Sequence, residues 1–152
     1  MKTLKVGDKA PEFIALDEYE KSVSLTDFLG KKVILYFYPK DMTPGCTVES
    51  CNLSDNYKLL KDKGFEILGV SPDSSISHQK FINKYNLPFK LIADTNKNLI
   101  KVYGVWGPKK FMGKEYDGVH RRTFVINETG YIERVFDKVN TKDHTQQILN
   151  SY

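Results

Sequence analysis

The most constraining feature of the sequence is an uninterrupted run of apolar and aromatic residues, Val33 to Tyr38. The run does not alternate between apolar and polar side chains, as a strand with one solvated face would. Such runs are typical of a central strand that is covered on both faces of a sheet. Phe65 to Val70 is a second strand of this kind and ends at Ser71-Pro72-Asp73. Together with intervening helical segments, the two strands predict a layered α/β domain.

Further elements follow from local signals. Gly64 ends the first predicted helix, Pro88 ends the second, and Ile148 and Leu149 on the third are expected in the core. The predicted helices span 44–63, 75–85 and about 141 to the last residue. The strands 119–126 and 131–136 flank the turn Asn127–Gly130 and predict a hairpin.

Length and charge limit the possible functions. A chain of 152 residues predicts one domain, residues 1–152. The net charge is +4, but Lys and Arg are scattered, which argues against nucleic-acid binding. The first residues contain no signal-peptide pattern, and no apolar run approaches the ~18 residues of a membrane span. We therefore expect a cytoplasmic protein with no membrane association.

The two cysteines carry the chemical information. In a reducing compartment, cysteines are more often catalytic or metal-binding than structural. The chain has two cysteines and three histidines, His78, His120 and His144, and none of their spacings matches those preferred by zinc. We therefore expect no metal and no other cofactor. We interpret His120 as a surface or supporting group.

The segment from Pro39 to Cys51 leaves a buried strand and enters a helix, where ligand sites of open α/β sheets lie. Thr43 suits the N-cap and Pro44 the first helical position, which places Cys46 in the first turn. There the free backbone N–H groups and the helix dipole favour a thiolate. The sequence thus predicts a nucleophilic Cys46.

The spacing Pro39-x-x-x-Thr43-x-x-Cys46 resembles the active-site signature of the peroxiredoxins. With Cys51 five residues further on, the segment is similar to the bacterioferritin-comigratory protein (PrxQ) subfamily. Matching segments cover almost the whole chain in order: 7–13, 36–51, 103–107, 111–114 and 118–126.

This resemblance implies a thioredoxin-like fold, with a mixed central sheet, helices on both faces and a peroxiredoxin-type N-terminal extension. It implies a thiol peroxidase in which Cys46 attacks hydrogen peroxide or an alkyl hydroperoxide and becomes a sulfenic acid. Cys51 would then form an intramolecular disulfide with Cys46. A thioredoxin or similar dithiol would reduce it, and the protein is expected to be a monomer.

The resemblance also assigns supporting roles. Thr43 matches the residue whose hydroxyl contacts thiolate and peroxide, and Pro39 matches the residue that shields the sulfur. Glu49 stands where a glutamate orients the active-site arginine, which corresponds to Arg121. Strand alternation groups Arg121 with Thr123 and Val125, and Arg122 with Phe124 and Ile126. Alternation alone does not decide which arginine reaches Cys46, so Arg121 rests on the resemblance.

Plainer interpretations stay open at several positions. Cys51 could be a small buried residue, Thr43 only a helix cap and Glu49 an ordinary acid of the first turns. Trp106, Phe111 and Met112 could line the active-site mouth, but packing in the core is the favoured interpretation. The alternative function is a thiol–disulfide oxidoreductase acting on protein disulfides. Such enzymes resemble C-x-x-C proteins, whereas four residues separate the cysteines here.

Overall fold

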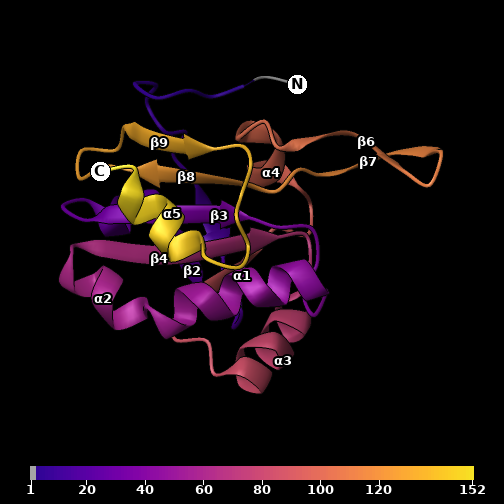
Figure 1. Ribbon diagram of the computed structural model, residues 1–152, viewed down its shortest axis with the longest axis horizontal. Helices are drawn as coiled ribbons and strands as arrows, with labels where there is room; N and C mark the ends of the chain where they lie inside the picture. Colours follow the sequence, from indigo (N-terminus) through magenta and orange to yellow (C-terminus); the bar gives the residue numbers. More distant parts are fainter. Residues whose placement is uncertain (1–2) are drawn as a thin grey trace.

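The computed structural model describes residues 3–152 and has a five-stranded mixed sheet at its centre (Figure 1). The strand order is β5-β4-β3-β8-β9. The three parallel strands are β3 (Lys32–Phe37), β4 (Phe65–Ser71) and β5 (Lys90–Ala93). β8 (Arg122–Ile126) runs antiparallel to β3, and β9 (Ile132–Phe136) antiparallel to β8. The two predicted apolar runs are therefore adjacent central strands.

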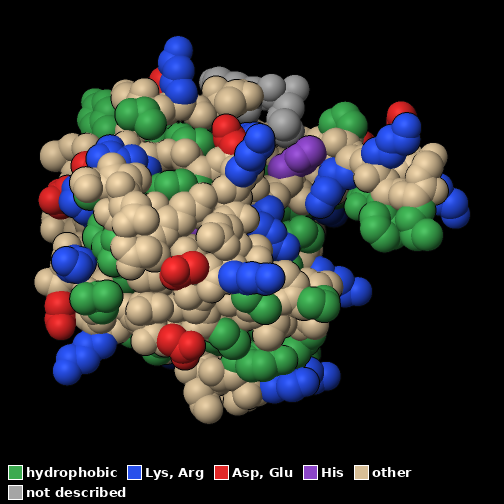
Figure 2. All heavy atoms as spheres, in the orientation of Figure 1, with side chains coloured by type: hydrophobic (Ala, Val, Ile, Leu, Met, Phe, Trp, Pro, Cys, Tyr) green, Lys and Arg blue, Asp and Glu red, His purple; other side chains and the backbone are tan. Residues whose placement is uncertain are grey.

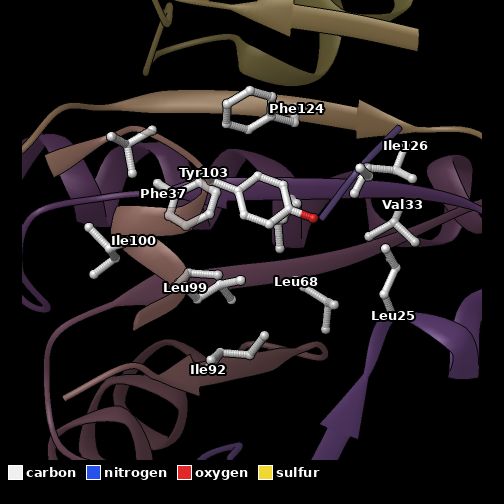
Figure 3. Close-up of a cluster of buried hydrophobic side chains, with 14 of the residues drawn as sticks. Leu25, Val33, Phe37, Leu68, Ile92, Leu99, Ile100, Tyr103, Phe124 and Ile126 are labelled. Atoms are coloured by element: carbon white, nitrogen blue, oxygen red, sulfur yellow. The ribbon is translucent and has the colours of Figure 1, made fainter. Parts of the chain in front are cut away.

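Helices cover both faces of this sheet because successive side chains of β3 point to opposite faces. Val33, Leu35 and Phe37 pack in one core cluster, and Ile34 and Tyr36 in another. Figure 3 shows the first cluster, to which η1 (Leu25–Phe28) and α4 (Asn98–Val102) contribute. The second cluster is covered by α1 (Pro44–Asp55), α2 (Tyr57–Asp62), α3 (Ser75–Tyr85) and α5 (His144–Asn150). The expected layered α/β arrangement is confirmed.

Two small antiparallel pairs lie outside the central sheet. β1 (Ile14–Leu16) and β2 (Ser22–Ser24) belong to the N-terminal extension. β6 (Trp106–Phe111) and β7 (Lys114–Val119) form an arm that projects from the body (Figures 1 and 2). Trp106 is partly buried and packs against the core, which agrees with the interpretation favoured from the sequence. For Phe111 and Met112 the packing interpretation is wrong, because they lie at the tip of the arm with 66% and 87% of their surface exposed.

Three predicted boundaries are corrected. The helix expected over 44–63 is two helices that meet at Asn56, whose side-chain amide donates to the carbonyl of Asn52 at 2.8 Å. The strand expected over 119–126 is also two, because Val119 ends β7 and β8 begins at Arg122. The backbone N–H of His120 donates to the carbonyl of Val105 at 2.7 Å and turns the chain between them. The last helix begins at His144, three residues later than expected.

The hairpin of β8 and β9 around residues 127–130 is confirmed. Within residues 3–152, no helix combines the length and apolar character that crossing a membrane requires.

Candidate active site

Cys46 lies in the first turn of α1, at the carboxyl end of β3, and its side chain is fully buried. Thr43 is the N-cap residue and Pro44 opens the helix, as the sequence predicts. The first helical hydrogen bond runs from the N–H of Thr47 to the carbonyl of Thr43, at 2.9 Å. The N–H groups of Gly45 and Cys46 precede it and have no partner within the helix. Cys46 thus lies at the positive end of the helix dipole.

Arg121 reaches the sulfur from the segment just before β8. Its Nη2 donates to Sγ of Cys46 at 3.3 Å, and its Nη1 donates to Oε1 of Glu49 at 2.7 Å. Burial pulls the pKa of Arg121 down, but the negative charges of Cys46 and Glu49 outweigh it and raise that pKa overall. Gly45 makes room for the guanidinium, because a Cβ there would lie 3.2 Å from Nη2. One arginine therefore joins two acidic groups of the same helix.

The neighbouring arginine points elsewhere. Nε of Arg122 lies 2.6 Å from Oδ1 of Asp137. Val125 shares the core cluster of Cys46, whereas Phe124 packs in the cluster on the opposite face. The expected alternation of side chains between the two faces of the sheet therefore extends to Arg121, one residue before β8. Arg121, the arginine expected in the active site, is the one that contacts the sulfur of Cys46.

Glu49 lies one turn after Cys46 and is fully buried. Burial raises the pKa of Glu49 to about 7, against the opposing attraction of Arg121. Its Oε1 accepts from Arg121, but its Oε2 has no hydrogen-bond donor among residues 3–152. Nε2 of His144 lies 3.7 Å from Oε2.

Thr43 and Pro39 lie in the loop that leads into α1. The hydroxyl of Thr43 donates to the carbonyl of Lys40 at 2.8 Å and makes no capping hydrogen bond to the helix. Pro39 is partly buried and follows Tyr38, the last residue of the apolar run. Both residues precede Cys46 by at most seven positions in the sequence, and the Thr43 hydroxyl donates to the loop rather than to the sulfur.

Cys51 lies on the same helix, partly buried, and both cysteines are unpaired. Burial and, to a smaller degree, the negative charge of Asp55 raise the pKa of the Cys51 thiol. Five residues of regular helix separate two Cα atoms by roughly 8.6 Å. A disulfide needs about 4.4–6.8 Å. The wound helix therefore holds the two cysteines apart.

A buried polar network that the sequence analysis missed anchors the loop before α1. Asp41 accepts from Tyr38 Oη at 2.6 Å and Ser77 Oγ at 2.8 Å, and its carboxylate lies 2.7 Å from Nδ1 of His78. Its backbone N–H donates to Asp73 at 2.8 Å. Asp41, Asp73 and His78 lie close enough together to hold a metal ion, yet both oxygens of Asp41 already accept hydrogen bonds from the protein.

Two further groups near the site were also missed. Lys109 on β6 donates to the carbonyl of Val119 at 2.8 Å, and burial together with the charge of Arg121 lowers its pKa. His144 lies behind Glu49 at the start of α5 and is fully buried. It precedes the core residue Ile148 by four positions, and this helical spacing is the signal that could have placed it on the buried face.

The buried cysteine at the start of α1 and the arginine on its sulfur form a candidate thiol-based active site at the carboxyl end of β3. The family model for the AhpC/TSA family matches residues 6–135. Peroxiredoxin Bcp of Escherichia coli is 47% identical over 150 residues, which cover 99% of this chain and 96% of that protein. The chain therefore belongs to the AhpC/TSA family, among peroxiredoxins of the Bcp or PrxQ type, and has thiol-dependent peroxidase activity.

Solved structures agree with this assignment. A cysteine-to-serine mutant of PrxQ from Xylella fastidiosa superimposes with a TM-score of 0.92 at 28% identity, covering 99% of this chain and 96% of the other. The bacterioferritin comigratory protein of Xanthomonas campestris gives a TM-score of 0.88 at 28% identity, covering 97% and 96%. The expected thioredoxin-like peroxiredoxin fold is confirmed.

Proposed function

We propose that Cys46 is the peroxidatic cysteine, and the contact of 3.3 Å between its sulfur and Arg121 carries this assignment. The Cys46 thiolate attacks the terminal oxygen of a hydroperoxide, ROOH. A sulfur–oxygen bond forms as the O–O bond breaks, which leaves Cys46 as a sulfenic acid and releases RO⁻. The released oxygen takes up a proton and leaves as ROH, which is water when the substrate is hydrogen peroxide.

The surrounding residues have separate roles in this proposal. Arg121 stabilises the thiolate and the charge that builds on the leaving oxygen. Glu49 orients Arg121 through the contact between Nη1 and Oε1. Thr43 positions the peroxide after its hydroxyl turns from the carbonyl of Lys40. Pro39 shields the sulfur from solvent.

Cys51 is the resolving cysteine in this cycle. Its thiol attacks the sulfur of the Cys46 sulfenic acid, water leaves and a disulfide forms. A thioredoxin or similar dithiol then reduces the disulfide, is itself oxidised and restores both thiols. A reducing compartment such as the cytoplasm suits these steps, and one chain holds both cysteines, so a monomer can complete the cycle.

Hydrogen peroxide and alkyl hydroperoxides are the proposed substrates. The Xanthomonas campestris relative is described in connection with alkyl peroxide reduction activity. The chemistry above uses only the side chains of this chain and the dithiol, so the proposal requires no metal, flavin or haem.

Stopped-flow peroxide reduction by wild type, Cys46→Ser and Cys51→Ser tests the assignment. Cys46→Ser is expected to abolish turnover, because the nucleophile is gone. Cys51→Ser is expected to react once with peroxide and to stop as a sulfenic acid, detected by mass after trapping. Turnover at the wild-type rate by Cys46→Ser would contradict the proposal. Reduction of insulin disulfides without peroxide would instead favour the oxidoreductase alternative.

A further inference from the structure

The second carboxyl oxygen of Glu49, Oε2, has no role in the proposed peroxidase mechanism. Glu49 is fully buried, and Oε2 finds no hydrogen-bond donor in residues 3–152. A buried ionised oxygen without a partner is costly, on the order of a few kcal/mol. A protonated carboxyl group avoids this cost if its O–H has an acceptor nearby. The question is therefore which atom could accept that proton.

His144 offers this acceptor, because its tautomer is fixed from the other side of the ring. Oε1 of Gln147 lies 2.8 Å from Nδ1 and also accepts from the backbone N–H of Asn140 at 2.9 Å. Nε2 of Gln147 donates to the carbonyl of Lys138 at 2.8 Å, which sets the orientation of its amide. Nδ1 of His144 must then carry the hydrogen, and the neutral ring has its lone pair on Nε2.

Two groups face this lone pair. The hydroxyl of Thr123 lies 2.8 Å from Nε2, and Oε2 of Glu49 lies 3.7 Å from it. The position of His144 is itself well determined. The next residue, Thr145, donates its N–H to Oδ1 of Asn52 at 2.8 Å, which fastens the start of α5 to α1. The arrangement is a built acceptor site behind Glu49.

We propose that Glu49 is protonated on Oε2 in the reduced enzyme, with His144 Nε2 as the acceptor of that proton, and that His144 is a positioning residue for the Glu49–Arg121 pair. The hydrogen bond needs the two atoms to approach by about 0.7–1 Å from their present separation. Nε2 has one lone pair, so the Thr123 hydroxyl, which lies 2.8 Å from it, must turn away when Glu49 binds there. This inference rests on the proposed function of Arg121, although its first test measures no activity.

Charge balance in the buried site supports the proposal. Arg121 interacts with both Glu49 and His144, Glu49 acts on Tyr36, and Oε2 of Glu49 lies 3.7 Å from His144. Tyr36 is neutral, because burial raises its pKa well above the ordinary value. A Cys46 thiolate and an ionised Glu49 would place two anions against Arg121, the cation that contacts both. Lys109 also interacts with Cys46, but burial and the charge of Arg121 lower its pKa. With Glu49 protonated, the positive charge of Arg121 is left to the sulfur and to the leaving oxygen.

The pKa shifts of Glu49 and His144 agree with a single proton shared by these two residues and held on Glu49. Burial raises the pKa of Glu49 to about 7. Burial, reinforced by the charge of Arg121, lowers the pKa of His144 to about 4, against the opposing hydrogen bond to Gln147. Around pH 5.5 the unfolded chain carries one proton on the imidazole and none on the carboxylate. The folded pair also carries one proton, now on Glu49, so folding takes up no proton there.

Nitrogen-15 NMR of the reduced wild-type protein is the first test. We expect His144 to be neutral at pH 6 with its hydrogen on Nδ1, and the infrared band of a protonated carboxyl group to disappear in Glu49→Gln. A tautomer with hydrogen on Nε2, or no carboxyl band assignable to Glu49, would overturn the proposal. Neither result depends on peroxide reduction, so a failure here is distinguishable from a failure of the proposed function.

The pH dependence of stability is the second test, through urea midpoints of the reduced proteins expressed as differences from wild type. In Glu49→Gln the raised carboxyl pKa is removed, so stability relative to wild type should fall as pH decreases from about 7 to 4.5. In His144→Phe the lowered histidine pKa is removed, so stability relative to wild type should fall as pH rises from about 4 to 6.5. Opposite slopes support the shared proton, and a flat difference curve for Glu49→Gln refutes it.

Peroxide kinetics complete the test of the positioning role. His144→Phe should lower the second-order rate constant by about 10-fold, because Glu49 loses the acceptor that holds it against Arg121. His144→Gln, whose amide oxygen can accept the proton, should restore part of the rate. His120→Gln is the matched control, since His120 directly precedes Arg121 in the sequence but its ring contacts the carbonyl of Pro108. An equal loss in His120→Gln would contradict the role of His144.

Discussion

Helices α1 and α3 each follow a central parallel strand, but they are fastened in different ways. In α3, Oγ of Ser74 accepts from the N–H of Ser77 at 3.2 Å, and the helix ends at Asn86 in the left-handed conformation with φ 51°. In α1, the N-cap Thr43 turns its hydroxyl to the loop carbonyl of Lys40, and the helix ends at Asn56 against α2. Of these two helices, only α3 has an N-cap side chain that accepts a hydrogen bond from a backbone N–H of its first turn.

Contacts from elsewhere in the fold hold α1 instead. Arg121 contacts its first turns, Tyr36 Oη lies 2.9 Å from Ser50 Oγ, and Asn52 binds the N–H of Thr145. Its own sequence favours a helix weakly, through Gly45, Thr47, Ser50, Asn52 and Ser54. A helix that depends on tertiary contacts can unwind when those contacts change. We therefore expect α1 to unwind when the proposed disulfide forms and α3 to keep its structure.

The largest expected effect is loss of amide protection in α1 after peroxide treatment. A disulfide between Cys46 and Cys51 requires backbone movement, since the wound helix separates their Cα atoms by roughly 8.6 Å. We expect exchange of the amides at 46–54 to rise by roughly 10³-fold, as local opening becomes nearly free, while α3 is unchanged. Hydrogen exchange with mass spectrometry measures both helices in one sample.

Cys51→Ser treated with peroxide is the control for this experiment, because it is oxidised at Cys46 without closing the disulfide. Its α1 should keep most of its protection. Equal protection of residues 46–54 in reduced and oxidised wild type, with the disulfide confirmed by mass, would end the distinction between a moving and a fixed helix.

The next effect concerns the contacts that Arg121 makes with the side chains of Cys46 and Glu49 on α1. Arg121→Met should lower the second-order rate with peroxide by roughly 10²-fold or more, the scale of losing one preorganised donor. It should also increase exchange at the start of α1 and leave α3 unaffected. Arg122→Met, whose side chain pairs with Asp137, is the matched control and should cost little in rate. The reverse ranking in stopped-flow measurements would contradict the roles proposed for the two arginines.

Local signals predicted the centre of this molecule. The apolar runs indicated β3 and β4 because burial on both faces leaves no polar alternation. Thr43 and Pro44 placed Cys46 in the first turn because both residue types favour helix starts. The side of the strand on which Arg121 lies followed from alternation, but its contact with Cys46 needed the family resemblance.

Features set by distant parts of the chain were not predicted. Behind Glu49, His144 comes from the far end of the sequence, so only the docking of α5 on α1 brings the two together. The arm of β6 and β7 has both faces largely exposed, so it has no apolar alternation to reveal it. The helix breaks at Asn56 because its side-chain amide, in place of its backbone N–H, donates to the carbonyl of Asn52. Helix propensity does not indicate which of the two donors will bind that carbonyl.

The smallest effect separates the two helix starts by stability alone. Ser74→Ala should lower the free energy of unfolding by about 1 kcal/mol, because it removes the oxygen that accepts from Ser77. Thr43→Val removes a hydroxyl that does not cap α1, so its effect on stability should stay within about 0.5 kcal/mol. Its effect should appear in the peroxide rate, through the positioning role proposed for this hydroxyl. Urea unfolding of the reduced proteins measures the stabilities, and equal losses in the two variants would mean that both helices depend on their N-cap side chains alike.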